Sequence, residues 1–519
     1  VEVARNDPGP GPRERLLLAA LLLATFALRA GKADQPIVEN YVGRQIPTAM
    51  VARNLERGSG WLRPQLHTGP FPNLFLVEPP LFAGLAVAFR RITGLPLTAS
   101  GRLVSALFTT LGAWGLYGLA RRREGIKVAL LAVAAFVVVP ITLRYGRAFQ
   151  PDIAMLGTQL AALRCWDEAG RRRTWWTLLA WPLLAASLAL KVTSAYILIP
   201  ILLSIRLTPP PPRPSPTRGE GDPSSPLSQG ERGEERRQRW SDRPVRRAIL
   251  ALVALAPALL WYGHAAGLLH EVGGSRASAE SATIWLGAIG KIEALGRLPG
   301  LAWRFAVVRA FTPIGFMLAI GGWFGVGKLD ALWRIWAVAA IGALALLVGK
   351  AHHEYYWLIL APLAALGIGR ALAALPRGWA VAAWVGFAAL AFVQVRSTWQ
   401  TPAEWFHLAE AAAVVRKHVP GDALVVASEA LLFAADRRGC RLEFEPEAAA
   451  RAAREWGGQL DPADPHALVE FYRGRGARYL AVLDPDDAWR GRVRGRYRIL
   501  VDRPGVLLAR LEGASDGDD

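Results

Sequence analysis

Cysteine is scarce in this sequence, which has 2 cysteines, Cys165 and Cys440, among 519 residues. Two widely separated cysteines indicate neither a disulfide framework nor a cysteine-based metal site. Acidic residues are also in the minority, because 42 Asp and Glu face 61 Lys and Arg and leave a formal net charge of +19. The arginine clusters separate apolar segments, which is typical of cytoplasmic loops in a membrane protein, so no nucleic-acid partner is expected.

Hydrophobic residues make up 52% of the chain, and 20 tryptophans are available for membrane interfaces. This composition is too apolar for an ordinary soluble protein. We predict a polytopic α-helical membrane protein with about 11–13 transmembrane helices, since a spanning backbone must satisfy its own hydrogen bonds. The apolar runs lie near residues 16–30, 79–97, 103–119, 127–143, 152–165, 175–190, 192–206, 247–266, 311–327, 331–349, 355–375 and 378–395.

Composition divides the chain into consecutive units. Residues 1–206 are predicted to form an N-terminal transmembrane bundle, with an active-site loop at 32–82. Residues 207–246 are dense in Pro, Gly, Ser, Glu and Arg, which predicts a disordered cytoplasmic linker. Residues 247–395 form a second transmembrane bundle, and 396–519 a small soluble α/β domain. This domain lacks a Gly-rich phosphate loop and a nucleophile elbow, so we expect it to assist rather than catalyse.

Basic loops at 120–127, 167–176, 209–247 and 376–378 should face the cytoplasm. With the N-terminus in the cytoplasm, these loops all face the cytoplasm only if the short segment 79–97 does not cross the membrane. It would then enter and return, or lie along the surface. The expected location is therefore the inner (plasma) membrane, with multiple passes. The active-site loop and the C-terminal domain would both be extracytoplasmic.

The stretch 32–82 is too polar for lipid, yet it is rich in aromatic residues and prolines. From Pro47, apolar residues recur at helical spacing opposite arginines, which predicts a short helix on the membrane surface that Gly58 ends. In the same loop Glu39 could take a proton from an acceptor hydroxyl as general base. The plain alternative is a solvated loop glutamate.

Further polar residues stand beside apolar runs. Arg147 matches phosphate geometry, and Asp152 could orient it. Lys191 lies between two apolar runs, where it must reach the interface or an anion. His352 and His353 are adjacent and cannot share one helical face, so a zinc site is not expected.

The motifs GRQIPTAMVARNLERGSGWLRPQ, EPPLFAGLAVAFRRITG, VVPITLRYGRAFQPDIAMLGTQLAAL, SLALKVTSAYILIPILL and HEYYWLILAPLAALGIGRAL follow one another along most of the chain. In this order and spacing they resemble the GT-C type membrane glycosyltransferases, specifically the bacterial relatives of protein O-mannosyltransferases and of lipid A aminoarabinose transferases. The resemblance implies sugar transfer from a polyprenyl-phosphate donor to a hydroxyl of a protein, lipid or glycan on the outer face.

The resemblance also assigns roles. It implies Glu39 as the general base, and it places these residues at the donor: Arg147, Asp152, Lys191, Arg44, Glu78, His353 and Tyr355. Relatives often carry an Asp-Glu pair where this chain has Glu39-Asn40, and a lysine before Pro-Pro where it has Glu78. The second difference removes one cation from the expected donor site.

Two other classes of function remain open at this point. A transporter or flippase of lipid-linked sugars would also bind such a donor, but this sequence shows no clear internal repeat, and its notable charges cluster at one face. A non-catalytic subunit of cell-envelope assembly is the other alternative, because the Asp-Glu pair is missing. No resident cofactor is assigned, and a divalent cation is left open. Membrane lipids are expected partners in every case.

Overall fold

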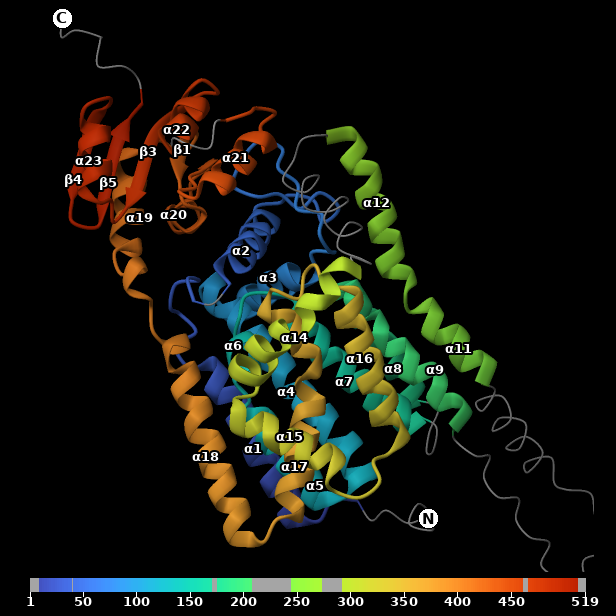
Figure 1. The fold of residues 1–519 in the computed structure, drawn as a ribbon. Coiled ribbons are helices and arrows are strands. Elements are labelled where there is room, and N and C mark those ends of the chain that lie inside the picture. The colour runs from blue at the N-terminus through green and yellow to red at the C-terminus, as the bar shows by residue number, and fades with distance from the viewer. Residues whose placement is uncertain are drawn as a thin grey trace, which may run out of the picture.

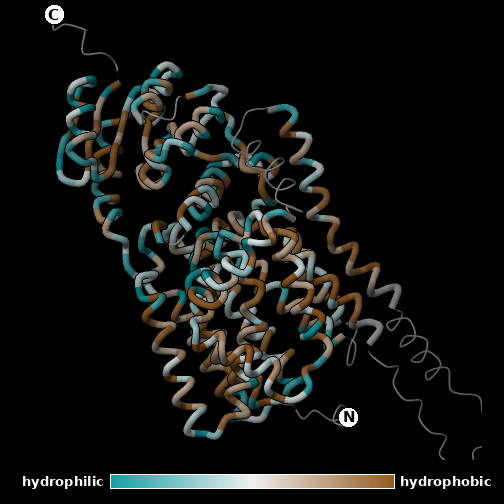
Figure 2. Tube along the Cα trace, in the orientation of Figure 1, coloured by the Kyte–Doolittle hydropathy of each residue, from teal (hydrophilic) through white to brown (hydrophobic). Residues whose placement is uncertain are grey.

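The computed structural model describes residues 9–39, 41–169, 175–207, 244–272, 292–460 and 465–511. Within these ranges a bundle of helices carries a smaller α/β domain at one end (Figure 1). Hydrophobic residues are concentrated in the helices of the bundle, whereas the α/β domain is more mixed (Figure 2). The predicted class of helical membrane protein with a small C-terminal α/β domain is confirmed. The predicted linker 207–246 lies outside the described residues except at its two ends.

The first half of the bundle contains α1 (Pro12–Ala30), α2 (Val42–Glu56), α3 (Leu81–Thr93), α4 (Leu97–Glu124), α5 (Ile126–Val138), α6 (Pro140–Tyr145), α7 (Asp152–Ala169), α8 (Trp175–Leu190), the 3-10 helix η1 (Val192–Ile197) and α9 (Leu198–Leu207). Proline and glycine set several of these breaks. Pro140 begins α6, and Gly94 ends α3 in the left-handed region at φ 72°. With 13 residues, α3 is shorter than a simple membrane span, and the non-crossing role of 79–97 stays a prediction.

The second half contains α11 (Pro244–Val253), α12 (Ala256–Val272), η2 (Ile292–Arg297), α14 (Leu298–Leu301), the π-helix η3 (Ala302–Ala310), α15 (Pro313–Phe324), α16 (Ala331–Leu346), η4 (Glu354–Leu360), α17 (Ala361–Ala374) and α18 (Arg377–Val395). Thr312 has a positive φ of 62°, and the chain bends there by 105° between 293–310 and 313–324. The segment that ends in η3 therefore runs at a steep angle to α15.

Four helical segments in the described part are long and apolar enough to cross a membrane, or five if the bent pair counts as one span. These segments are Leu97–Glu124, Ala248–Glu271, Glu354–Ala374 and Arg377–Trp405. Shorter apolar helices of 10–17 residues accompany them, for example Trp175–Leu190 and Ala331–Leu346. The membrane-protein class is thus supported, while the figure of about 11–13 crossings stays a prediction.

The helices α4 and α7 approach each other through glycine. A Cβ atom on Gly157 would lie 2.1 Å from the carbonyl oxygen of Phe108, and one on Gly115 would lie 2.6 Å from the carbonyl carbon of Leu160. Small residues allow this close backbone approach, which is a main source of helix association in lipid.

We expect Gly157→Ala to lower the free energy of unfolding by about 1–3 kcal/mol, because the added methyl group overpacks the α4–α7 contact. The measurement is the thermal midpoint of the detergent-solubilised protein. Gly263→Ala in α12 is the matched control, since a Cβ atom there meets nothing within 4 Å. Equal midpoints for the two variants would contradict the close α4–α7 contact.

The chain after α18 forms η5 (Arg396–Trp399), η6 (Ala403–Trp405), α19 (Leu408–His418), β1 (Leu424–Ala427), α20 (Glu429–Ala435), β2 (Gly439–Arg441), α21 (Pro446–Glu455), α22 (Pro465–Arg473), β3 (Ala477–Leu483), α23 (Asp487–Arg494), β4 (Arg498–Arg503) and β5 (Val506–Arg510). The strand order is β2-β1-β3-β5-β4. Strand β1 is parallel to β2 and β3, whereas β5 is antiparallel to β3 and β4.

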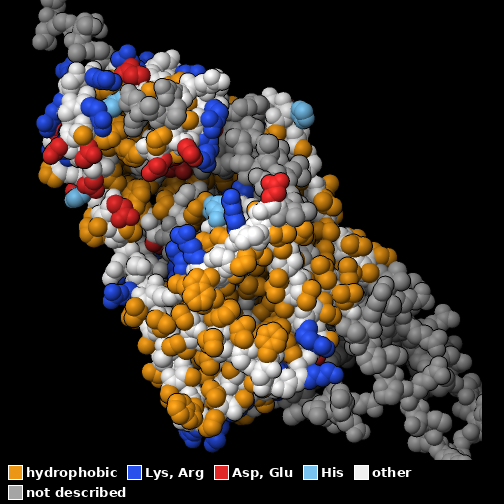
Figure 3. All heavy atoms as spheres, in the orientation of Figure 1, with side chains coloured by type: hydrophobic (Ala, Val, Ile, Leu, Met, Phe, Trp, Pro, Cys, Tyr) orange, Lys and Arg blue, Asp and Glu red, His pale blue; other side chains and the backbone are white. Residues whose placement is uncertain are grey.

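The loop between α2 and α3 joins this domain by main-chain hydrogen bonds. The amide of Gly69 donates to the carbonyl of Gly439 at 2.9 Å, and the amide of Gly439 donates to the carbonyl of His67 at 3.0 Å. The loop therefore extends the edge of the sheet beside β2. On the outside of the molecule, Lys, Arg and His side chains gather along the hollow between the domain and the bundle (Figure 3).

Helix α2 differs from its prediction in two ways. It begins at Val42 rather than at Pro47, which lies inside the helix. Most of its residues are buried rather than exposed at a membrane surface, because α3 and α20 pack against it. Arg53 and Arg57 on α2 form ion pairs with Asp436 after α20, so the arginines that indicated a solvated face instead bind the C-terminal domain.

Candidate active site

Two buried ion pairs lie together at the end of the bundle that carries the C-terminal domain. Arg44 of α2 pairs with Glu78, which precedes α3. Lys191, which follows α8, pairs with Asp152, the first residue of α7. Arg44 lies within electrostatic reach of Asp152, and Glu78 within reach of Lys191. These four residues form one group, called here the charge cluster.

An aromatic wall borders the charge cluster. The ammonium nitrogen of Lys191 lies 4.5 Å from the ring centre of Tyr355 and 4.6 Å from that of Tyr356. The ring of His353 stacks on Tyr355 at 5.5 Å, and Tyr41 lies 4.9 Å from His353. Aromatic faces attract cations, so the wall helps to hold the Lys191 ammonium group in place. His353 and Tyr355 thus border the charge cluster, and their role at the donor stays a prediction.

The environment of the cluster affects its proton chemistry. Burial raises the pKa of Glu78 above its ordinary value, although the nearby charge of Arg44 opposes this shift. Burial also lowers the pKa of His353 to about 3, so this imidazole is neutral at pH 7. Within the described residues, Oδ2 of Asp152 has no hydrogen-bond partner. The cluster thus contains a carboxyl group with a raised pKa and a buried oxygen that is able to accept another bond.

Glu78 also borders a small cavity of about 20 Å³, lined in addition by Thr48, Phe75 and Pro151. That volume suits roughly one water-sized group. A hydroxyl group can therefore be accommodated next to the Glu78 carboxylate.

Glu39 lies outside the charge cluster. Both of its carboxylate oxygens accept hydrogen bonds from Arg102 at 2.6 Å, and the Glu39 side chain is 2% exposed. Arg102 in α4 also donates to the main-chain carbonyls of Ala33 and Pro36. This arrangement suits a counter-ion that holds the start of the loop, and the catalytic role of Glu39 remains a prediction.

Arg147 is also separate from the charge cluster. Its guanidinium group is buried and donates to the carbonyls of Gly31, Lys32 and Thr398. It thereby joins the start of the active-site loop to the chain that follows α18. Asp152, which the sequence suggested as the residue orienting Arg147, pairs with Lys191 instead.

Sequence reasoning did not find a further group of charges close by. Glu354, at the start of η4, accepts a hydrogen bond at 3.0 Å from Nε of Arg144 in α6. Its other oxygen lies 3.1 Å from Nη2 of Arg309 in η3. The sequence signal was the cost of ionisable residues beside apolar runs, which applies to Arg144 and Glu354 as it does to Lys191.

A mainly apolar cavity of about 920 Å³ begins next to Lys191. Its walls come from η1, α9 and α16, for example Val192, Ile199, Leu203 and Leu346. Arg334 is the one charged residue among those that line it. The cavity has the apolar character of a lipid-tail site, and its lining begins at Val192, one residue after Lys191.

No group of three or more His, Cys, Asp or Glu residues in the described ranges is placed to hold a metal ion. The rings of His352 and His353 lie 3.9 Å apart, but no carboxylate completes a site around them within those ranges.

Comparison with known proteins places this architecture in context. Residues 77–214 match the protein family described as dolichyl-phosphate-mannose-protein mannosyltransferase. No curated protein matches the chain in sequence. The structure of ArnT from Cupriavidus metallidurans bound to undecaprenyl phosphate is similar, with a TM-score of 0.57 and 13% identity, over 97% of this chain and 99% of that one.

Two further solved structures share the fold. One is the oligosaccharyltransferase AglB from Archaeoglobus fulgidus, in complex with an inhibitory peptide and a dolichol-phosphate, with a TM-score of 0.52 and 12% identity over 98% of this chain and 75% of that one. The other is the arabinofuranosyltransferase AftD from Mycobacteria, with a TM-score of 0.52 and 17% identity over 98% and 40% of the two chains. The protein has the fold of the GT-C membrane glycosyltransferases and resembles these relatives.

Proposed function

We propose that this protein is an integral-membrane glycosyltransferase that moves a sugar from a polyprenyl-phosphate donor to an acceptor hydroxyl. The observations that carry the proposal are the charge cluster and the apolar cavity, whose lining begins one residue after Lys191 in the chain. Lys191 and Arg44 supply cations for a phosphate group, and the cavity next to Lys191 accepts an isoprenoid chain. The undecaprenyl phosphate and dolichol-phosphate bound by two structural neighbours support this class of donor.

In the proposed reaction, Glu78 accepts the proton of the acceptor hydroxyl. The acceptor oxygen then forms a bond to the anomeric carbon, and the bond from that carbon to the donor phosphate oxygen breaks. Its electron pair leaves with the phosphate, whose growing charge Lys191 and Arg44 stabilise. The products are the glycosylated acceptor and polyprenyl phosphate. Glu78 is favoured over Glu39 as the base, because Arg102 already binds both oxygens of Glu39.

The acceptor is proposed to arrive from the outer face of the inner membrane. Arg-rich segments in the sequence support this orientation, because they suit the cytoplasmic side. The C-terminal domain and the active-site loop share one end of the bundle, so both would be extracytoplasmic. A hydroxyl of a protein, a lipid or a glycan fits this arrangement equally.

The test uses purified protein in lipid nanodiscs with a radiolabelled polyprenyl-phosphate sugar and an extract of outer-leaflet acceptors. We expect the label to move to an acceptor as polyprenyl phosphate is released, and Lys191→Met to abolish both. Lys328→Met is the matched control, because Lys328 is an exposed lysine outside the charge cluster. If proteoliposomes move the intact donor across the bilayer without consuming it, the protein is a flippase and the proposed activity is wrong.

A further inference from the structure

Arg309 forms a group of charges with Arg144 and Glu354, and it is the only one of the three that is exposed to solvent. The side chains of Arg144 and Glu354 are each 6% exposed, whereas that of Arg309 is 50% exposed. Arg144 holds one oxygen of Glu354 through both Nε and Nη2. Arg309 makes one contact of 3.1 Å to the other oxygen. The Arg309 contact is thus the weaker and more accessible of the two.

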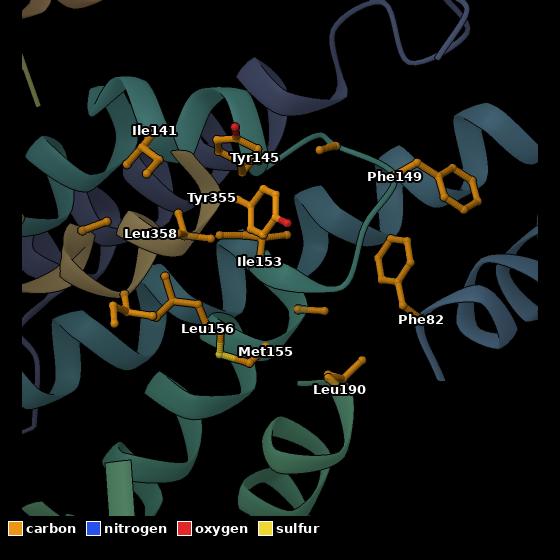
Figure 4. Packing of buried hydrophobic residues seen from close by; sticks show 14 of the residues in the cluster. Phe82, Ile141, Tyr145, Phe149, Ile153, Met155, Leu156, Leu190, Tyr355 and Leu358 are labelled. Atoms are coloured by element: carbon orange, nitrogen blue, oxygen red, sulfur yellow. The ribbon is translucent and has the colours of Figure 1, made fainter. Parts of the chain in front are cut away.

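This group lies next to the charge cluster. Tyr145 is within electrostatic reach of Glu354, Arg144, Asp152 and Arg309. Its ring lies 6.2 Å from that of Tyr355, which in turn supports Lys191. Figure 4 shows Tyr145 from α6 and Tyr355 from η4 beside each other. Arg309 and Asp152 of the charge cluster thus both lie within electrostatic reach of the same tyrosine, Tyr145.

Charge balance requires a further cation when a phosphate binds. The charge cluster contains two cations and two carboxylates, so it has no net charge when all four groups are ionised. The Arg144–Glu354–Arg309 group contains two cations and one carboxylate, which leaves one positive charge in excess. A phosphate that enters a buried site without a compensating charge is strongly disfavoured. Arg309 is an accessible source of that charge beside the site.

The backbone that carries Arg309 is suited to local movement. Arg309 lies in the π-helix η3, one residue before its end, and the chain bends by 105° directly after it. Thr312 in this bend has a positive φ of 62°, which is unusual for a residue other than glycine. Turns of π-helix occur frequently at functional sites, because their hydrogen bonding is less regular than that of an α-helix.

We infer that Arg309 is a donor-phosphate ligand, which leaves Glu354 and binds the lipid phosphate when the donor enters. Glu354 does not become unpaired in this exchange, because Arg144 keeps its two contacts. The inference rests on the proposed function, since it requires a phosphate-bearing lipid at the charge cluster.

The test measures equilibrium binding of polyprenyl phosphate, with the uncharged polyprenol as a second ligand. We expect Arg309→Ala to weaken binding of the phosphate by about 10- to 100-fold and to leave binding of the polyprenol unchanged. Arg309→Lys should recover part of the loss, because a charge returns without the planar fork. Arg304→Ala is the matched control, because it removes another exposed arginine from the same helix. Thermal midpoints confirm that each variant is folded.

The outcomes separate this inference from the proposed function. If Arg309→Ala binds polyprenyl phosphate like the wild type while Lys191→Met does not, Arg309 is not a phosphate ligand, and the proposed function stands. If Arg309→Ala weakens binding of polyprenol as much as binding of polyprenyl phosphate, Arg309 acts through packing and the inference is wrong. If wild-type protein does not distinguish the two lipids, the proposed function fails first.

Discussion

Replacing Glu78 with glutamine should slow sugar transfer by about 10²–10⁴-fold, the usual contribution of a general base. The amide keeps the size of the side chain and can still contact Arg44, so the site should remain assembled. Binding of polyprenyl phosphate should persist, since Lys191 and Arg44 are unchanged. The measurements are single-turnover transfer from the labelled donor and equilibrium binding of the lipid phosphate.

The pH profile gives a second measure of the same role. Burial raises the pKa of Glu78, so its carboxylate becomes protonated at a higher pH than that of an exposed glutamate. A protonated carboxyl cannot accept the hydroxyl proton, and turnover should therefore fall as the pH decreases through this raised value. In Glu78→Gln the residual turnover should lose this acid limb. An unchanged acid limb in that variant would mean that another group produces it.

Glu39→Gln is the contrasting variant, because the sequence alone pointed to Glu39 as the base. We expect it to lower the free energy of unfolding by about 3–5 kcal/mol, since it removes the partner of the buried Arg102. Transfer per folded molecule should stay near the wild-type value. If folded Glu39→Gln loses transfer and Glu78→Gln retains it, Glu39 is the base and the role proposed for Glu78 is wrong.

Much of the fold was predictable because it depends on local pattern. The apolar stretch ARYLAVL predicts a strand and coincides with β3. The stretches RYRILVD and GVLLARL predict a closing pair of strands and correspond to β4 and β5. Strand β2 has 3 residues, which is too short to show an alternating pattern, and it exists because β1 pairs with it. The predicted start of this helix at Pro47 is wrong, because the helical pattern is apparent only after Pro47, which lies in the sixth position of α2.

The sequence predicts which residues belong to the candidate site better than it predicts which of them form ion pairs. Asp152 and Lys191 are predicted from their place beside apolar runs, and Arg44 and Glu78 from the family resemblance; the structure brings the four together. Their pairing depends on where α2, α3, α7 and α8 end relative to one another, which one sequence does not reveal. Arg102 was overlooked because its partners are mainly backbone carbonyls, and carbonyl acceptors leave no signature in a sequence.

Arg147 is another residue whose carbonyl partners the sequence does not reveal, and its replacement should have a large effect on stability. The sequence suggested a phosphate ligand, but the side chain is fully buried and donates to carbonyls of Gly31, Lys32 and Thr398. Each buried carbonyl that loses its donor costs about 1–3 kcal/mol. Arg147→Ala should therefore lower the thermal midpoint strongly and expose the chain between α18 and α19 to proteolysis.

Arg147→Lys should recover little of this stability, because a compact ammonium group cannot reproduce the planar fork that reaches carbonyls of two chain segments. Arg396→Ala is the matched control, since Arg396 is an exposed arginine in η5, close in sequence to Thr398. The measurements are thermal unfolding, limited proteolysis and polyprenyl-phosphate binding by the folded fraction. A folded Arg147→Ala with a normal midpoint and lost lipid-phosphate affinity would show that Arg147 binds the donor after all. A lowered thermal midpoint, with normal affinity for polyprenyl phosphate in the folded fraction, would show that Arg147 joins the active-site loop to the C-terminal domain.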